Sequence, residues 1–288
     1  SLFAVPYVGW MSIFVVAPII IMVVYAFSTA AGDFTLENFA RMGTYTAVFT
    51  RSFKLAIIAT LIALLIGYPV SYMLSKEGPQ VQRIAMVLIM LPMWMNFLLR
   101  TYSWMSILEN NGLLNQLFQQ IGLIDLYNQI AMHFASDPAA YVPIDHFQMI
   151  GTQGAVVLGM VYNYLPFMIL PIYSVLVKLD HSLIEAARDL GASSVQVFRK
   201  VILPLSLPGV LSGITMVFVP SVSTFAISRL LGGGTQMMLG DLIEQQFLGG
   251  AYNPQLGAAI ALVMMAIVVV CMLVMNRFGD GEEQAVML

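Results

Sequence analysis

The chain has 288 residues, of which 59% are hydrophobic and only 9% are charged. Ordinary soluble domains carry about 25% charged residues, so this composition excludes a soluble globular protein and predicts a protein of the membrane. The net charge is −3 with no basic patch beyond Arg199-Lys200, which gives no indication of a nucleic-acid partner.

The first predicted element is a transmembrane helix between Val5 and Phe27. No charged residue precedes Asp33, and this run is long enough to cross a bilayer. A cleavable signal peptide is the alternative. It lacks support because the basic segment of such peptides is absent, and because their apolar core is usually only about 7 to 15 residues long.

The second predicted span runs from Leu55 to Ser75, directly after Lys54, and the pair Gly67 and Pro69 is expected to bend it. A third span begins near Ile84 and includes Leu91 to Trp104, in which polar and aromatic side chains interrupt apolar sequence. Four of these side chains are candidates for a solute pathway: Trp94, Asn96, Arg100 and Tyr102.

Arg100 is the most informative of these four residues, because a charge within a span is costly. It either faces a water-filled path or lies near the end of the span, where its side chain can reach outward to the interface. The neighbouring aromatic residues fit an interfacial belt as well as they fit a pathway. The sequence leaves both interpretations open.

Residues 109–148 form the longest predicted non-spanning stretch. Apolar residues from Leu113 to Ile121 recur at helical spacing, which predicts an amphipathic helix lying on the outer face of the membrane. Asp125, Asp137 and Asp145 make this stretch acidic, as a cation-attracting surface or an ordinary solvated loop would be.

The fourth predicted span lies between Phe147 and Val177, where no charge occurs and where Pro166 and Pro171 are expected to break the helix. A fifth span is predicted at about 207–228 and a sixth at about 256–276. Their polar, aromatic and charged members complete the list of candidate pathway residues: Asn163, Tyr164, Ser223, Thr224, Phe225 and Arg229.

A charged stretch from Ser182 to Pro204 separates the fourth and fifth spans. Ser182 with Glu185 has the spacing of a capping box, which predicts a helix from about Leu183, and Gly191 is expected to end it. Ser193 and Gln196 repeat the capping pattern for a second helix. Pro204 is expected to limit how far that second helix runs.

The first of these helices is too short to persist without tertiary contacts. Leu183, Ile184, Ala187 and Leu190 are expected to form one apolar side, with Glu185, Arg188 and Asp189 pointing elsewhere. Such a helix suits docking into the cleft of a partner. A plain loop between two spans, capped only for stability, is the alternative.

This stretch resembles the EAA loop of ABC importer permeases in four places. They are Glu185-Ala186-Ala187, Gly191, Val201 and Leu203-Pro204, and Val201 stands where the family usually has isoleucine. The resemblance implies an all-α integral membrane protein of about six transmembrane helices. A cytoplasmic coupling loop, at about residues 178–204, would lie between the fourth and fifth helices and dock on an ATP-binding subunit.

Four further segments resemble the spermidine/putrescine import permeases: Pro6 to Trp10, Leu91 to Trp104, Tyr164 to Tyr173 and Ser223 to Gly234. This resemblance implies a single permease domain over residues 1–288 in the bacterial inner membrane, which imports polyamines by alternating access. The implied partners are two ATP-binding subunits, a second permease subunit and an extracytoplasmic solute-binding protein. The chain itself would bind no cofactor, with ATP and magnesium on the partner.

Other functions remain possible on the sequence. An ABC permease for another small solute, such as an amino acid, an anion or another organic ion, would share much of this pattern. A secondary transporter should carry carboxylates within its spans, whereas every Asp and Glu here is predicted to fall in a loop or tail. A membrane enzyme or metal site would need clustered groups, and the three histidines show no paired ligand spacing.

Arg229 conflicts with a polyamine pathway, because the resemblance leads one to expect an acidic residue there. A guanidinium group would repel a polycation unless Asp241 or Glu244 neutralises it.

Overall fold

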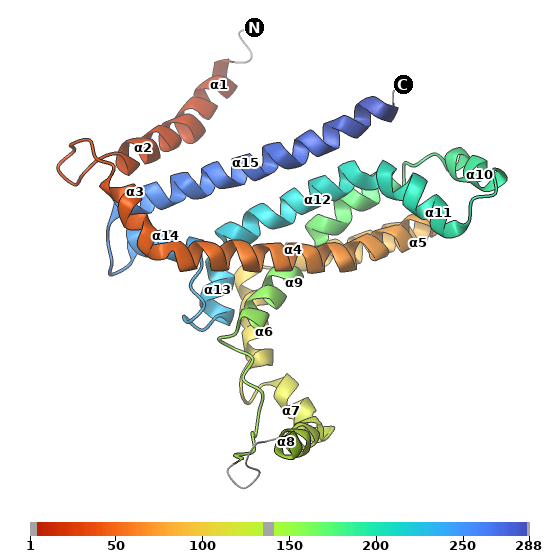
Figure 1. Cartoon of the computed structure of the whole chain (residues 1–288), viewed down its shortest axis with the longest axis horizontal. Helices are drawn as coiled ribbons and strands as arrows, with labels where there is room; N and C mark the ends of the chain where they lie inside the picture. The colour runs from red at the N-terminus through yellow and green to blue at the C-terminus, as the bar shows by residue number, and fades with distance from the viewer. Residues whose placement is uncertain (1–4, 135–140, 287–288) are drawn as a thin grey trace.

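The computed structural model describes residues 5–134 and 141–286, and the regular structure of these residues is helical apart from one isolated bridge between Ser28 and Phe34. Long helices run side by side along the body of the molecule (Figure 1). They are α1 (Val5–Met11) continued through a π-helical turn (Ser12–Val16) into α2 (Ala17–Ala26), α4 (Thr46–Ser75), α5 (Pro79–Trp94), α9 (Gln153–Leu176), α12 (Leu203–Ser223) and α15 (Pro254–Val286).

Shorter helices lie at the ends of this body and on an arm that projects from its middle (Figure 1). The arm consists of α6 (Phe97–Leu108), α7 (Leu113–Gln120) and α8 (Leu123–Phe134). One end of the body carries α10 (His181–Asp189) and α11 (Ser194–Val197), and the opposite end carries α3 (Glu37–Arg41) and α14 (Leu239–Leu248). Helix α13 (Ala226–Leu231) lies between that end and the arm.

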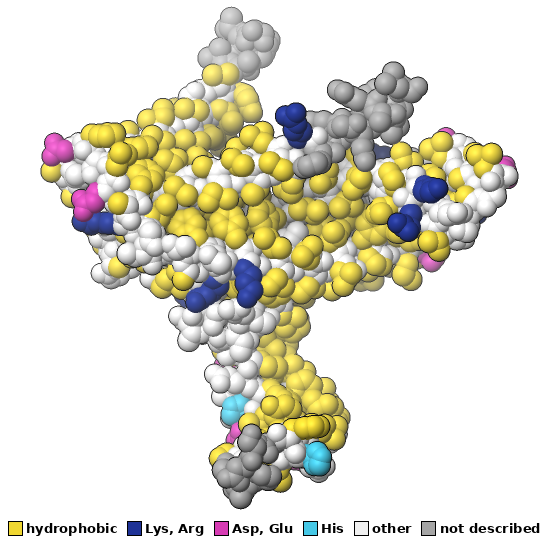
Figure 2. Space-filling view, viewed as in Figure 1, with side chains coloured by type: hydrophobic (Ala, Val, Ile, Leu, Met, Phe, Trp, Pro, Cys, Tyr) yellow, Lys and Arg dark blue, Asp and Glu magenta, His cyan; other side chains and the backbone are white. Residues whose placement is uncertain are grey.

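Five of the described helical segments are long and apolar enough to cross a membrane, and the pair α5 and α6 makes a sixth if it is counted as one bent span. The expectation of about six transmembrane helices is therefore confirmed. Figure 2 shows hydrophobic side chains covering most of the body, with few charged side chains among them. Such a surface is stable against lipid or another apolar partner rather than against water.

The helices α4, α9 and α12 form the core, and α9 is the most buried of them. Small residues let their backbones approach closely. A Cβ atom at Gly209 would lie 2.8 Å from the Pro171 carbonyl oxygen, and one at Gly213 would lie 2.8 Å from the Met168 sulfur. A side chain at Gly209 would force α12 away from α9, because the contact is with backbone, whereas one at Gly213 would require the Met168 side chain to move.

Several predicted helix bounds are wrong. The helix of the second span, α4, begins at Thr46, so that Lys54 lies inside it. Pro166 and Pro171 do not break α9, which is continuous from Gln153 to Leu176. Proline in a membrane helix is tolerated because neighbouring helices and local adjustments satisfy the freed carbonyl groups.

Two further spans differ from the predictions at their ends. The third is interrupted after Trp94 and bends by 90° into α6. The fifth ends at Ser223 rather than near Ser228, and it begins at Ser194 because α11, a π-helical turn (Phe198–Ile202) and α12 form one continuous segment. Pro204 does not stop this helix, because it lies in the first turn of α12 beside the π-helical turn.

The layout makes a prediction about topology. Ser194 on α11 and Gln80 at the start of α5 lie towards one end of the body, and Tyr252, before α15, lies towards the other. In a Cys271→Ala background, we expect Ser194→Cys and Gln80→Cys to resist an impermeant thiol reagent in intact cells, whereas Tyr252→Cys reacts. Lysed membranes, in which all three cysteines should react, provide the control. Labelling of Ser194→Cys from outside would contradict the layout.

Candidate functional site

The predicted docking helix α10 begins earlier than the sequence suggested. Its N-cap is Asp180, whose carboxylate Oδ1 accepts a hydrogen bond from the Ser182 backbone N–H at 2.9 Å. The predicted capping box between Ser182 and Glu185 is therefore wrong. Asp180 occupies the capping position first, and Glu185 remains exposed on the helix surface.

Gly191 ends α10, as predicted. Its φ of +80° lies in the left-handed region that glycine adopts without strain. The Ala192 N–H donates to the Ala187 carbonyl at 3.1 Å, and the Gly191 N–H donates to the Arg188 carbonyl at 2.8 Å. These two bonds form a Schellman motif, which satisfies carbonyl groups at the helix end.

The second capping box is confirmed. The Ser193 hydroxyl accepts from the Gln196 N–H at 3.4 Å, and the Gln196 side chain accepts from the Ser193 N–H at 2.7 Å. Leu203 and Pro204, the last residues of the loop motif, lie within the first turn of α12. The loop is thus joined to the fifth span by unbroken helix.

The apolar residues of α10 do not form one outward face, contrary to the prediction. Ile184 and Ala187 pack inward against a buried cluster that includes Leu176, Val197 and Ile202. Leu183 on α10 and Leu190 at its C-cap point away from this cluster. They are 47% and 90% exposed, respectively. The surface free to meet a partner consists of these leucines with Glu185, Ala186 and Asp189.

A second candidate site lies where two spans are interrupted. After α5 the chain turns extended at Met95, and the Asn96 side chain then caps α6 by accepting from the Leu98 N–H at 2.8 Å. After α12 the chain is extended at Thr224 before α13 begins. Helix α6 packs against both α9 and α13, so the two interruptions lie near each other. Irregular backbone at membrane depth occurs where it is buried in protein or lines a water-filled space.

Arg100 lies inside this second site. Its residue is only 8% exposed, and neither Nε nor Nη1 has a hydrogen-bond partner among the described residues. The interpretation that its side chain reaches outward to the interface is therefore wrong. Arg100 lies near Tyr164, whose hydroxyl contacts Thr224. A buried, incompletely bonded guanidinium is costly, which marks it as a functional candidate.

Asn163 is a further buried polar residue, next to Tyr164 on α9. Its Nδ2 donates to the Gly159 carbonyl at 2.9 Å, whereas Oδ1 has no partner within the described chain. Arg100, Tyr164 and Thr224 give the helix interruptions a polar interior, and Asn163 adds an amide on the same helix as Tyr164. A hydroxyl, an amide and a cation there could orient a polar solute or ordered water.

The remaining candidate pathway residues are more exposed. Trp94 is 75% exposed, and Tyr102 and Phe225 are each 47% exposed. Ser223 is also exposed, and its hydroxyl donates to the Val219 carbonyl at 3.2 Å. The structure does not gather these four side chains with Arg100 in one enclosed cavity, so they are available to lipid or to a neighbouring subunit.

Arg229 forms an ion pair with Glu244 through two hydrogen bonds, one of which joins Nη1 to Oε1 at 3.0 Å. The pair joins α13 to α14 and neutralises the charge that conflicted with a polycation. Its side chains are 47% and 25% exposed, so it lies at the surface rather than in the core.

The sequence analysis placed Asp241 in a loop and considered it only as a possible partner of Arg229, so it missed the burial of this residue within α14. Its Oδ2 accepts from the Ser228 hydroxyl and from the Met238 N–H at 3.0 Å, whereas Oδ1 has no partner among the described residues. Burial raises the pKa of this carboxyl above its ordinary value. In a capping box, the side chain three residues after the N-cap bonds back to the backbone of the N-cap residue. Asp241 has this spacing from Met238, which is the pattern that could have identified it.

Comparison with known proteins places the chain in a family. The family model described as binding-protein-dependent transport system inner membrane component matches residues 60–281. The chain is 35% identical over 278 residues to the spermidine/putrescine transport system permease protein PotB of Escherichia coli K12, which covers 94% of both chains. It is also 35% identical to PotB of Haemophilus influenzae, over 91% of this chain and 88% of the relative.

A solved structure shares the fold. It is a bacterial ABC transporter involved in the import of the acidic polysaccharide alginate, with a TM-score of 0.72, 18% identity, and coverage of 97% of this chain and 94% of that one. At this identity the likeness concerns the fold alone. The helical spans, the family match and the relatives agree: the chain belongs to the binding-protein-dependent transport system inner membrane component family, as a multi-pass permease subunit of the bacterial inner membrane rather than an enzyme.

Proposed function

We propose that this permease imports polyamines such as spermidine and putrescine as one subunit of an ABC importer. The similarity to relatives named for spermidine/putrescine transport extends over 94% of the chain. The structural observation that supports the proposal is the ion pair between Arg229 and Glu244, because it removes the main electrostatic objection to a polycation near α13.

The proposed partners follow from the family and from the free face of α10. Two ATP-binding subunits hold ATP and magnesium, and one of them contacts the face with Leu183, Glu185 and Leu190. A second permease subunit completes the pathway, and an extracytoplasmic binding protein delivers the solute. The coupling loop lies in the cytoplasm. These assignments suit a chain in which α11, the helix that follows the docking helix, continues into a spanning helix without a break.

In this mechanism ATP-driven closure of the ATP-binding subunits moves α10, and the movement passes through α11 into α12. The end of α12 adjoins Thr224, Tyr164 and Arg100, where the spans are interrupted. A change in the tilt of α12 therefore alters the packing at the polar interior. Alternation between an outward and an inward opening follows from two stable packings of these helices.

One observation favours a second candidate function, import of an anionic or zwitterionic solute. The guanidinium of Arg100 is buried with two nitrogens, Nε and Nη1, unbonded within the described chain, and a carboxylate could accept from both. A polyamine offers no such acceptor. In the polyamine proposal, ordered water or a different packing of α6 and α9 satisfies Arg100 instead.

Competition for uptake separates these two candidates. In cells that express the whole transporter, we expect excess putrescine or spermidine to block uptake of labelled spermidine, and we expect glutamate and glycine to leave it unchanged. Arg229→Ala should change the rate of uptake without changing this preference, because Arg229 already pairs with Glu244. Competition by an amino acid or anion, with none by polyamines, would overturn the polyamine proposal and leave family membership intact.

A further inference from the structure

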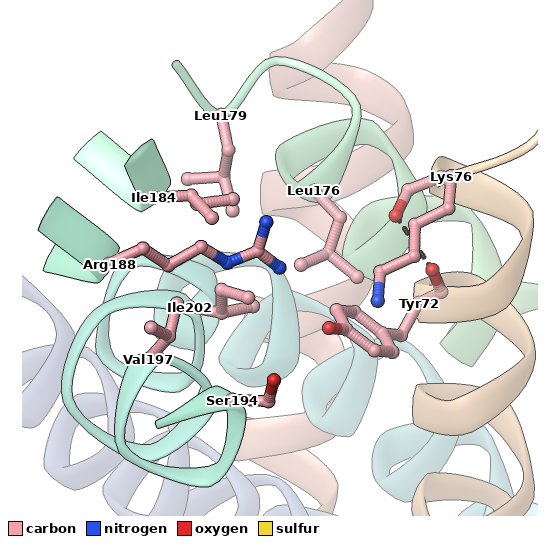
Figure 3. A pocket seen from close by; sticks show the side chains of 10 residues that line it. Tyr72, Lys76, Leu176, Leu179, Ile184, Arg188, Ser194, Val197 and Ile202 are labelled. Atoms are coloured by element: carbon pink, nitrogen blue, oxygen red, sulfur yellow. Dashed lines mark hydrogen bonds between the residues drawn. The ribbon is translucent and has the colours of Figure 1, made fainter. Parts of the chain in front are cut away.

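A cavity of about 320 Å³ lies behind the predicted docking helix, between α10 and the ends of α4 and α9. Figure 3 shows Arg188 extending from α10 into this space, with Tyr72 and Lys76 of α4 on the other side and Ser194 of α11 below. The cavity therefore lies between the predicted coupling loop and the end of the second span. Its position differs from the polar interior around Arg100.

Two of the described residues that line the cavity, Lys76 and Arg188, are positively charged. None of the described lining residues is Asp or Glu. Neither cation has an ion-pair partner within the described ranges. The Lys76 ammonium instead lies 3.9 Å from the centroid of the Tyr72 ring. Two cations that share one space repel each other unless an anion lies between them.

The rest of the lining suits an amphiphilic anion. Leu176, Ile184 and Ile202 supply apolar walls, and the hydroxyl of Ser194 supplies a hydrogen-bond donor. The cavity lies where α4 and α9 end, which is the level of the membrane interface. Basic pockets between transmembrane helices on the cytoplasmic side bind lipid head groups.

We propose that this cavity binds the phosphate head group of an anionic phospholipid. The ATP-binding subunit is a less suitable source of the negative charge, because the cavity lies on the inner side of α10. The leucines available to a partner lie on its outer side. A lipid reaches the inner side directly from the bilayer, with its acyl chains along the apolar spans.

The bound head group would brace α10. The contacts of α10 with the rest of the chain are mainly with α11 and the π-helical turn, and α4 is not among its main partners. A phosphate held by both Lys76 and Arg188 would link α10 directly to α4. The inference goes beyond the proposed polyamine import, and it holds for any transported solute.

Lipid retention tests the site directly. The whole transporter, purified from vesicles of phosphatidylcholine and phosphatidylglycerol, should retain phosphatidylglycerol in native mass spectrometry. We expect Lys76→Gln and Arg188→Gln each to lower the affinity by about five-fold, because a basic side chain near an anionic surface contributes about that factor. Arg188→Lys, which keeps the positive charge, should retain most of the affinity that Arg188→Gln loses. Lys200→Gln, which removes an exposed cation that does not line the cavity, is the matched control.

A functional measurement accompanies the binding measurement. Phosphatidylglycerol should raise the ATPase activity coupled to transport in the normal complex and in Lys200→Gln, but not in the double variant Lys76→Gln with Arg188→Gln. Equal lipid retention by the double variant and by Lys200→Gln would overturn the proposal. The proposal would also be overturned if inorganic phosphate, added to vesicles of phosphatidylcholine alone, raised the ATPase activity as much as phosphatidylglycerol does. The ligand would then be free phosphate.

Discussion

Replacing Leu190 by lysine is expected to abolish uptake while the protein remains inserted and folded. Leu190 is 90% exposed at the end of α10, so its side chain contributes little to the packing of this chain. A lysine near a helix C-terminus is also favourable electrostatically. Any loss of transport must therefore arise at the contact with a partner.

The size of the effect follows from burial in that contact. A leucine side chain buried on association contributes about 1.5 to 3 kcal/mol, so its loss should weaken docking by at least about ten-fold. An ammonium group placed in an apolar cleft adds a further desolvation cost. Co-purification of the ATP-binding subunit and uptake in cells are the measurements.

Leu248→Lys is the matched control for this experiment. Leu248 is 82% exposed and ends α14 at the opposite end of the body, as Leu190 caps α10. We expect normal association with the ATP-binding subunit in this variant. Glu185→Lys provides an independent check, because Glu185 forms no hydrogen bond within the described chain that its reversal could break. Normal uptake by Leu190→Lys would refute docking through the outer face of α10.

Replacing Asp241 by leucine is expected to destabilise the packing of α13 against α14. The Met238 N–H would lose its acceptor, and an unsatisfied buried donor costs about 1 to 3 kcal/mol. The Ser228 hydroxyl would lose less, because the Phe225 carbonyl lies within 3.0 Å of it. Thermal unfolding of the purified complex should show the loss, with Glu244→Gln as a partly exposed control.

The same carboxylate should make stability depend on pH. Burial raises its pKa in the folded protein, so the folded state binds the proton more tightly than the unfolded state does. Its contribution to stability is therefore present in acid. It decreases as the pH rises from the unfolded value of about 3.9 through the raised pKa. Asp241→Asn should remove this dependence, and an unchanged profile in that variant would contradict the assignment.

The sequence was sufficient for the features that depend on local chemistry. The apolar runs predicted the spans because a bilayer requires length and hydrophobicity. Gly191 and the pair Ser193 and Gln196 predicted the helix end and the second cap, because these depend on a few adjacent residues. The resemblance in residues 185–204 and in four other segments agreed with the family that the comparisons established.

The wrong predictions concern features that depend on tertiary packing, where the local sequence allows more than one structure. Asp180 and Ser182 are both good caps, and only the path of the chain decides between them. The helix passes through a π-helical turn that begins at Phe198 and then continues past Pro204. The Phe198 ring packs against the rings of Tyr68 and Tyr72, with centroid distances of 5.9 and 5.5 Å. The burial of Arg100 and Asp241 depends on helices distant in the sequence, which no periodicity in their own segments reveals.

The unbroken helical segment from Ser194 to Ser223 has a mechanical consequence. It contains 30 residues, and at about 1.5 Å per residue it is about 45 Å long. A rigid rod of that length converts a rotation of about 5° at one end into a displacement of about 4 Å at the other, roughly the width of a methylene chain. A small angular movement at the capping box would thus suffice to open or close a passage for a slender solute beside Thr224.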